Sequence, residues 1–162
     1  MRFFQKEDPN ILVVDDDKGL ADTLVEYLSL LGYSATAAYG GREALSRFQE
    51  GDFQIVITDL MMPEMDGMEL LKTVTMLDSR AIVMVITGYG TIESAVQAIK
   101  NGAYDFIKKP VKLEELAIIV KRAIERHSLF KQIGLFRGLT LALIVSVPLW
   151  LFLGIVLALL CR

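Results

Sequence analysis

Acidic, hydroxyl and basic side chains stand directly after four separate apolar runs of the sequence. Asp15, Asp16 and Asp17 follow the first of these runs, and Asp59 ends another. Carboxylates held close together repel one another and raise one another's pKa values unless a cation lies among them. Hard oxygen ligands with room for water suit Mg²⁺. If the fold brings the two groups together, the pattern predicts a magnesium site.

A hydroxyl and an ammonium group complete this set. Thr87 ends a later run, and Lys108 and Lys109 precede Pro110 after the last one. A lysine beside such carboxylates can hold an incoming phosphoryl oxygen, so the set has the parts needed for phosphoryl transfer to a carboxylate. Simpler interpretations exist: the first three aspartates as helix N-caps, Asp59 and Thr87 as turn residues, and the lysines as a solvated pair.

The elements that must position these side chains alternate between strands and helices. Short β-branched runs separated by helical patterns indicate βαβ units around a parallel sheet. We predict an α/β fold with a five-stranded, doubly wound parallel sheet, whose chemistry lies at the carboxyl ends of the strands. The predicted strands are 11–14, 34–38, 54–58, 81–87 and 104–107, and the predicted helices are 20–31, 41–49, 68–77, 92–100 and 113–127.

The composition separates an acidic body from a basic and then apolar tail. The 162 residues suggest one domain, and their 53% hydrophobic content exceeds the roughly 45–50% of soluble domains. The net charge of −3 combines −8 for residues 1–120 with +5 for residues 121–162. This balance excludes a basic protein that coats nucleic acid, but not a DNA reader with a local basic patch. The lone Cys161 excludes an intramolecular disulfide, and no secretory signal begins the chain.

The tail contains a charge-free stretch of 23 residues, 139–161. As a helix it would be about 35 Å long, enough for a hydrocarbon core of about 30 Å. We predict one transmembrane helix there, joined to the body by a linker or helix extension over 128–138, with Pro148 making the span kinked or re-entrant. A buried globular helix is the alternative. Basic residues before the span place the body in the cytoplasm.

Four ordered motifs carry a family resemblance. They are ILVVDD (11–16), TDLMMPEMDG (58–67), VITGYG (85–90) and YDFIKKP (104–110). Over residues 8 to 127 the chain resembles the receiver domain of bacterial two-component response regulators, which has a flavodoxin-like fold. It is most similar to receivers of the nitrogen-regulation activator type. We therefore expect residues 1–127 to form a receiver domain.

This resemblance implies a role for each residue of the acidic group. Asp59 would be the phosphoacceptor, and Mg²⁺ would be held by Asp15, Asp16, Asp59 and the backbone carbonyl of Met61. Lys109 would pair with the phosphoryl group.

Further implied roles concern the switch and the lifetime of the phosphorylated form. Thr87 would hydrogen-bond to the phosphoryl group, and Phe106 would be the aromatic switch that turns inward with it. Met61 and Tyr89 flank the route of the attacking water and would tune hydrolysis, whereas Lys108 has no matching role.

The resulting expectation is a membrane-anchored single-domain response regulator at the cytoplasmic face of the bacterial inner membrane. A sensor histidine kinase or phosphotransfer protein would supply the phosphoryl group, and the domain would catalyse only its own phosphorylation and dephosphorylation. We expect no direct nucleic-acid binding, since no Walker motif or helix-turn-helix follows, and leave open a phosphorylation-dependent homodimer. The alternatives are a membrane-complex scaffold and an aspartyl-phosphate phosphatase, although no Asp-x-Asp arrangement follows Asp59.

Overall fold

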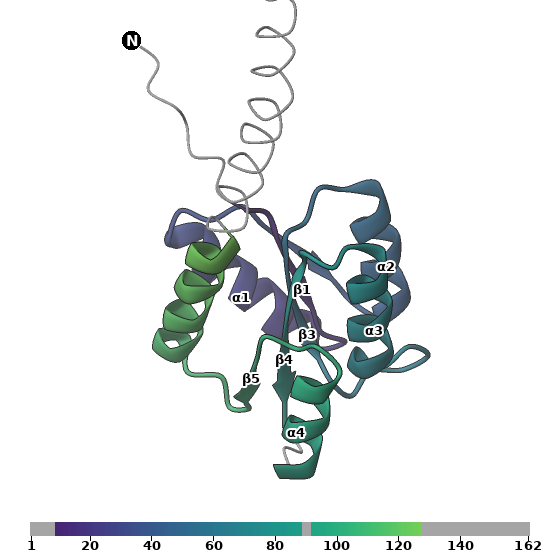
Figure 1. Cartoon of the computed structure of the whole chain (residues 1–162). Coiled ribbons are helices and arrows are strands. Elements are labelled where there is room, and N and C mark those ends of the chain that lie inside the picture. The colour runs from purple at the N-terminus through teal and green to yellow at the C-terminus, as the bar shows by residue number, and fades with distance from the viewer. Residues whose placement is uncertain (1–8, 89–91, 128–162) are drawn as a thin grey trace, which may run out of the picture. The chain divides into compact units, whose positions relative to one another are not determined.

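A computed structural model describes residues 9–88 and 92–127, which form a five-stranded parallel sheet with helices on both faces (Figure 1). The sheet order is β2-β1-β3-β4-β5. The strands are Ile11–Val14 (β1), Ala35–Ala38 (β2), Ile55–Asp59 (β3), Ile82–Thr87 (β4) and Asp105–Lys108 (β5). The helices are Lys18–Leu30 (α1), Gly41–Glu50 (α2), Gly67–Leu77 (α3), Ile92–Lys100 (α4) and an unlabelled helix over 113–127.

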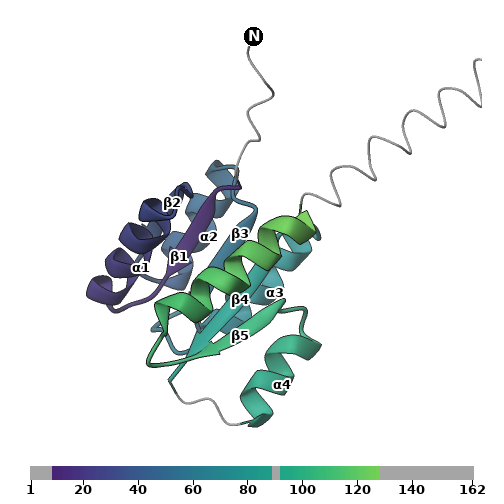
Figure 2. The same ribbon diagram turned by 90° about the vertical axis from the view of Figure 1, so that its left-hand side faces the viewer.

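Alternation of side chains along the strands builds a separate apolar core on each face of the sheet. In β1, Ile11 and Val13 belong to the core under α1 and helix 113–127, whereas Leu12 and Val14 belong to the core under α2, α3 and α4. Figures 1 and 2 show the same division of helices between the faces. Because both faces are covered, the inner strands β1 and β4 are fully buried and read as almost continuous apolar runs, as is typical of parallel sheets. The edge strands β2 and β5 are only partly buried.

Local sequence signals set the beginnings and ends of the helices. Asp17 and Asp66 are the N-caps of α1 and α3, and their carboxylates accept hydrogen bonds from the N–H groups of Leu20 and Glu69. After α1, Gly32 adopts a φ of 90°, a left-handed conformation that glycine tolerates best and that commonly ends a helix.

The predicted fold is confirmed, with small shifts of the strand boundaries. β2, β3, β4 and β5 each begin one residue later than predicted, because the preceding residues make turn or edge hydrogen bonds instead of ladder pairs. Ser34, for example, accepts a hydrogen bond from the N–H of Ile11 but is not in β2.

The predicted linker 128–138 and membrane span 139–161 lie outside the described residues, so both stay predictions. Contacts divide the chain after His127. Within residues 9–88 and 92–127, no helix combines the length and apolar character that crossing a bilayer requires.

Candidate functional site

The three consecutive aspartates after β1 have three different surroundings. Asp15 is buried, and one of its carboxylate oxygens accepts a hydrogen bond of 2.9 Å from the N–H of Asp17. Asp16 is exposed, and Asp17 is the N-cap of α1. The simple interpretation as helix caps therefore holds for Asp17, while Asp15 turns into the interior of the site.

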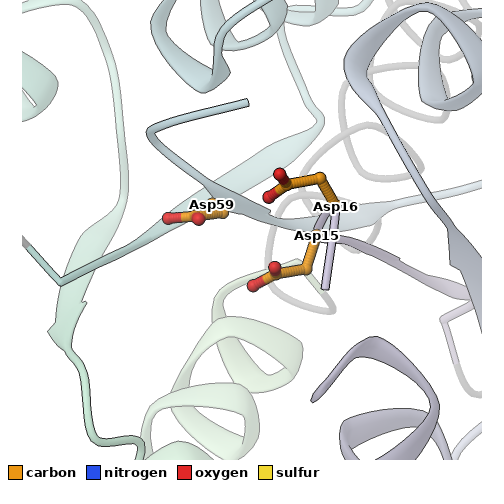
Figure 3. Close-up of side chains that lie close together, drawn as sticks. All are labelled: Asp15, Asp16 and Asp59. Atoms are coloured by element: carbon orange, nitrogen blue, oxygen red, sulfur yellow. The ribbon is translucent and has the colours of Figure 1, made fainter. Parts of the chain in front are cut away.

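Asp59, the last residue of β3, lies beside Asp15 because β1 and β3 are neighbouring parallel strands that end together. One carboxylate oxygen of Asp59 accepts a hydrogen bond of 2.7 Å from the N–H of Leu60. Figure 3 shows the carboxylates of Asp15, Asp16 and Asp59 gathered at this edge of the sheet. Each offers one oxygen, and the three oxygens lie within 4.8 Å of one another.

Lys109 follows β5 and reaches across the sheet edge to two of these acids. Its Nζ lies 2.8 Å from Oδ2 of Asp15 and 2.9 Å from Oδ2 of Asp59. The side chains of Asp15 and Asp59 are only 2% and 8% exposed, and that of Lys109 is 25% exposed. A single ammonium group is thus shared by two buried carboxylates, with the peptide bond that follows it, Lys109–Pro110, in the cis form.

The carboxylates of this cluster outnumber its one ammonium group. Burial raises the pKa of Asp15 and the charge of Asp59 adds to this, while the hydrogen bond from Lys109 opposes it. Burial lowers the pKa of Lys109, but its hydrogen bonds to Asp15 and Asp59 outweigh burial and leave the pKa raised. Three carboxylates therefore face one ammonium, which is an arrangement that favours an added cation.

The donor atoms fit Mg²⁺. The three carboxylates supply hard oxygen ligands within one small volume, and the exposed Asp16 leaves one side open to water, which Mg²⁺ usually retains in proteins. Asp15 and Asp59 keep free lone pairs after the hydrogen bonds described above, because an ionised carboxylate has about four acceptor sites. The residues present are those that a magnesium ion would need.

The remaining predicted site residues are placed as follows. Thr87, at the end of β4, is 1% exposed, and within the described residues its hydroxyl has no hydrogen-bond partner. Phe106 is 40% exposed and Met61 is 62% exposed. Lys108 is an exposed member of β5 outside the cluster. Tyr89 lies outside the described residues.

Gly67, the last residue of the motif TDLMMPEMDG (58–67), supports the site without a chemical role of its own. Gly67, at the start of α3, packs so closely that a Cβ atom there would lie 2.0 Å from the backbone oxygen of Asp59. Its N–H donates to the carbonyl of Leu60. Any side chain at this position would displace the backbone that carries Asp59. The Asp66-Gly67 pair, a helix cap followed by a glycine, is the only sequence signal for this contact.

Residues 11–121 match the model of the response regulator receiver domain family. The chain belongs to this family. Its likeness to solved receiver domains extends to the whole body: a response regulator receiver domain from Clostridium thermocellum has 31% identity and a TM-score of 0.72, over 75% of this chain and 98% of that one. NtrX from Brucella abortus, in complex with ATP, has 33% identity and a TM-score of 0.74, over 78% of this chain and 29% of that one.

Curated relatives of this receiver domain include transcriptional regulators. The regulatory protein AtoC of Escherichia coli is 38% identical over 76% of this chain and 27% of its own length. The C4-dicarboxylate transport transcriptional regulatory protein DctD of Rhizobium meliloti is 37% identical over 75% of this chain and 26% of its own length. The chain thus spans about a quarter of these relatives. They support a receiver with a phosphoacceptor role in two-component signalling, and the implied partner is a kinase or phosphotransfer protein.

Proposed function

We propose that this chain is a membrane-anchored response regulator in which Asp59 accepts a phosphoryl group in a Mg²⁺-dependent reaction. The proposal rests on the surroundings of the Asp59 carboxylate. This carboxylate is buried at the end of β3, accepts a hydrogen bond from the ammonium of Lys109, and lies close to two further carboxylates. A structural ion pair would need one acid for one base, whereas this cluster has an excess of acids.

The chemistry follows from these groups. A carboxylate oxygen of Asp59 attacks the phosphorus of a donor such as phosphohistidine, so that a P–O bond forms, the P–N bond breaks and the imidazole leaves. Lys109 moves from Oδ2 of Asp59 to a phosphoryl oxygen. The buried hydroxyl of Thr87 donates to another phosphoryl oxygen, which gives it the partner that it lacks among the described residues.

Asp15, Asp16, Asp59 and the Met61 carbonyl are the groups proposed to hold Mg²⁺. When bound, the ion supplies positive charge that offsets the excess of carboxylates and the negative charge of the phosphoryl group. Asp15 keeps its contact with Lys109, so the ammonium stays positioned while its other partner reacts. Met61, and the Tyr89 side chain, would then control the approach of the hydrolytic water. Phe106, now exposed, would turn inward as Thr87 engages the phosphoryl group.

A labelling experiment tests the phosphoacceptor. The full-length protein is incubated with Mg²⁺ and a small acyl phosphodonor, and the phosphorylated fraction is measured by gel mobility or mass spectrometry. Wild type should be labelled and Asp59→Asn should not. Asp52→Asn is the matched control, because Asp52 is an exposed carboxylate in the loop before β3. Equal labelling of wild type and Asp59→Asn would refute the proposed role.

The membrane anchor is supported by the charge-free run of 23 residues over 139–161. A full-length variant with lysines at Val145 and Leu153 should move from alkaline-washed membranes to the soluble fraction. It should keep Mg²⁺-dependent labelling of Asp59, since the substitutions lie outside the receiver. Recovery of wild type in the soluble fraction after lysis would contradict the anchor without affecting the phosphoacceptor.

We assign the phosphodonor to a sensor histidine kinase or phosphotransfer protein at the cytoplasmic face of the inner membrane. No direct contact with nucleic acid is assigned to the receiver, although its relatives include transcriptional regulators, because residues 1–120 carry a net charge of −8 and the phosphate backbone would repel them.

A further inference from the structure

The loop between β3 and α3, residues 60–66, follows Asp59 directly and contacts its carboxylate. Its first residue, Leu60, donates its N–H to Asp59, and its carbonyl accepts the N–H of Gly67 at 3.0 Å. Within the loop, Glu64 adopts a φ of 64°, a left-handed conformation that is uncommon for a residue with a side chain. The loop also includes Met61, whose carbonyl is a proposed Mg²⁺ ligand. Small shifts of this loop therefore move a ligand.

The first turn of α2 packs directly against this loop. Gly41 is buried, and a Cβ atom there would lie 2.4 Å from the backbone oxygen of Met65 and 2.7 Å from its Cγ. The nearest atom belongs to the backbone, so it cannot move away by a change of rotamer. The next residue, Arg42, makes an ion pair of 3.1 Å with Glu64 across the same contact.

The start of α2 is itself firmly held. The carboxylate of Glu43 accepts a hydrogen bond of 2.9 Å from the N–H of Tyr39, before the helix. The N–H of Ala44 donates to the carbonyl of Gly40 at 2.9 Å. Ala44 and Phe48 are buried in the core between α2 and the sheet. Because α2 is fixed at its start and along its inner face, an added side chain at Gly41 would displace the loop and not the helix.

We propose that Gly41 is a positioning residue for Mg²⁺: its lack of a side chain lets α2 hold loop 60–66, and with it the Met61 carbonyl, in place for the ion. Gly41 touches neither the ion nor the phosphoryl group and acts only through Met65. The inference rests on the proposed function, because it requires that Mg²⁺ binds at Asp15, Asp16 and Asp59.

Mg²⁺ binding of the full-length protein tests the inference. Isothermal titration of Mg²⁺ into Gly41→Ala should show a dissociation constant about tenfold higher than that of wild type, as is found when groups that orient metal ligands are changed. The labelling rate of Asp59 should fall at low Mg²⁺ and recover at saturating Mg²⁺. A general loss of structure would lower the rate at every Mg²⁺ concentration.

Gly40→Ala is the matched control. Gly40 is the neighbouring glycine, its φ of 168° is extended backbone open to any residue, and a Cβ atom there would have nothing within 4 Å. The substitution changes the entropy of the unfolded chain in the same way as Gly41→Ala. Its dissociation constant for Mg²⁺ should stay within twofold of wild type.

A second variant removes the contact from the side of the loop. Met65→Ala deletes a partly buried side chain that packs beside Gly41, and it should raise the dissociation constant for Mg²⁺ several-fold without a clash. This variant decides the question if Gly41→Ala does not fold. If folded Gly41→Ala binds Mg²⁺ with wild-type affinity, the inference about Gly41 is wrong but the proposed function still stands. If Gly41→Ala does not fold, wild-type affinity of Met65→Ala leads to the same conclusion. Failure of wild type to bind Mg²⁺ overturns the proposed function as well.

Discussion

Carboxylate–cation contacts of similar length occur both in the acidic cluster and on the surface, but their surroundings differ. On α2, Arg47 lies 2.8 Å from Glu43, and both side chains are well exposed, at 43% and 38%. Lys109 lies 2.8 Å from Asp15, whose side chain is 2% exposed. Water screens the surface pair, so each of its charges would still be solvated if the other were removed. In the cluster, the buried charges are stabilised mainly by neighbouring protein groups and not by water.

The pKa values of two aspartates show the effect of this difference. For Asp78, burial acts to raise the pKa, but hydrogen bonds from the N–H and guanidinium of Arg80 outweigh it and leave the pKa lowered. For Asp15, burial is the larger effect, and the hydrogen bond from Lys109 does not offset it. A contact distance alone therefore does not reveal whether a pair stabilises the fold. In the cluster, burial makes the charged form of Asp15 less favourable than it is in water.

The largest expected effect comes from removing the shared cation. Lys109→Met keeps most of the unbranched side chain but removes its ammonium, which leaves two buried carboxylates without their shared cation. We expect the free energy of unfolding at pH 7 without Mg²⁺ to fall by about 3 kcal/mol, the cost of stranding a buried charge. Urea unfolding measures this, and added Mg²⁺ should restore part of the loss. A loss of only about 0.3 kcal/mol, as expected for an exposed ion pair, would show that water solvates the cluster.

Asp15→Asn should act in the opposite direction. The folded-state pKa of Asp15 is raised, so folded protein binds more protons than unfolded protein between the two pKa values, and stability falls as pH rises through that window. At pH 7 without Mg²⁺ we expect Asp15→Asn to be more stable than wild type, because the neutral amide removes a charge that burial and the neighbouring Asp59 disfavour, while Lys109 keeps Asp59 as its partner. The difference should vanish below about pH 4, the ordinary aspartate pKa, where Asp15 is protonated in both states.

The same unfolding series measured with Mg²⁺ provides the control for Asp15→Asn. Mg²⁺ should stabilise wild type and leave Asp15→Asn unchanged, because a proposed ligand is lost. If the gain in stability of Asp15→Asn were the same at pH 7 and at low pH, its cause would be packing and not charge.

Thr87→Val tests whether an uncharged polar group of the cluster carries a similar cost. Valine has nearly the same shape, and it removes a buried hydroxyl that lacks a partner among the described residues. We expect the free energy of unfolding to rise by about 1 kcal/mol, the cost of an unsatisfied buried hydroxyl. Thermal unfolding without phosphodonor measures this. A decrease in stability would mean that the hydroxyl has a partner after all.

The smallest effect is expected on the surface. Arg47→Gln removes the ion pair with Glu43 but keeps a good helix former, so the free energy of unfolding should fall by only about 0.3 kcal/mol. The difference from wild type should disappear in about 1 M salt, where the screening length is about 3 Å. If the difference in stability persisted in about 1 M salt, the Arg47–Glu43 pair would be shielded from solvent ions, as the buried cluster is.

The sequence was sufficient to predict the sheet and the meeting of the acids with Lys109. Parallel strands end at one edge, so residues after β1, β3 and β5 must converge there, and the contacts of Lys109 confirm this for Asp15 and Asp59. The two consecutive lysines differ in their surroundings. Lys108 is the exposed last residue of β5, whereas Lys109 follows the strand and its ammonium contacts Asp15 and Asp59.

Other features of the site depend on packing between distant segments and were not predictable. Nothing in the local sequence of Gly41 indicates that it meets Met65, because that contact depends on how α2 and α3 lie together on the sheet. The sequence also did not predict that Lys109 would bridge two acids. The chemical roles of Asp59, Thr87 and Phe106, and the membrane span, stay predictions that the experiments above address.

The parallel arrangement of the strands has a consequence for how far a change at Asp59 must travel. Every strand ends at the edge that carries Asp59, while β1 begins, and helix 113–127 ends, at the opposite edge (Figure 1). The first residue of β1 and the last turn of helix 113–127 therefore lie at the far edge of the sheet from the nucleophile. A change at Asp59 would have to pass along the full length of the strands to reach either of these two points.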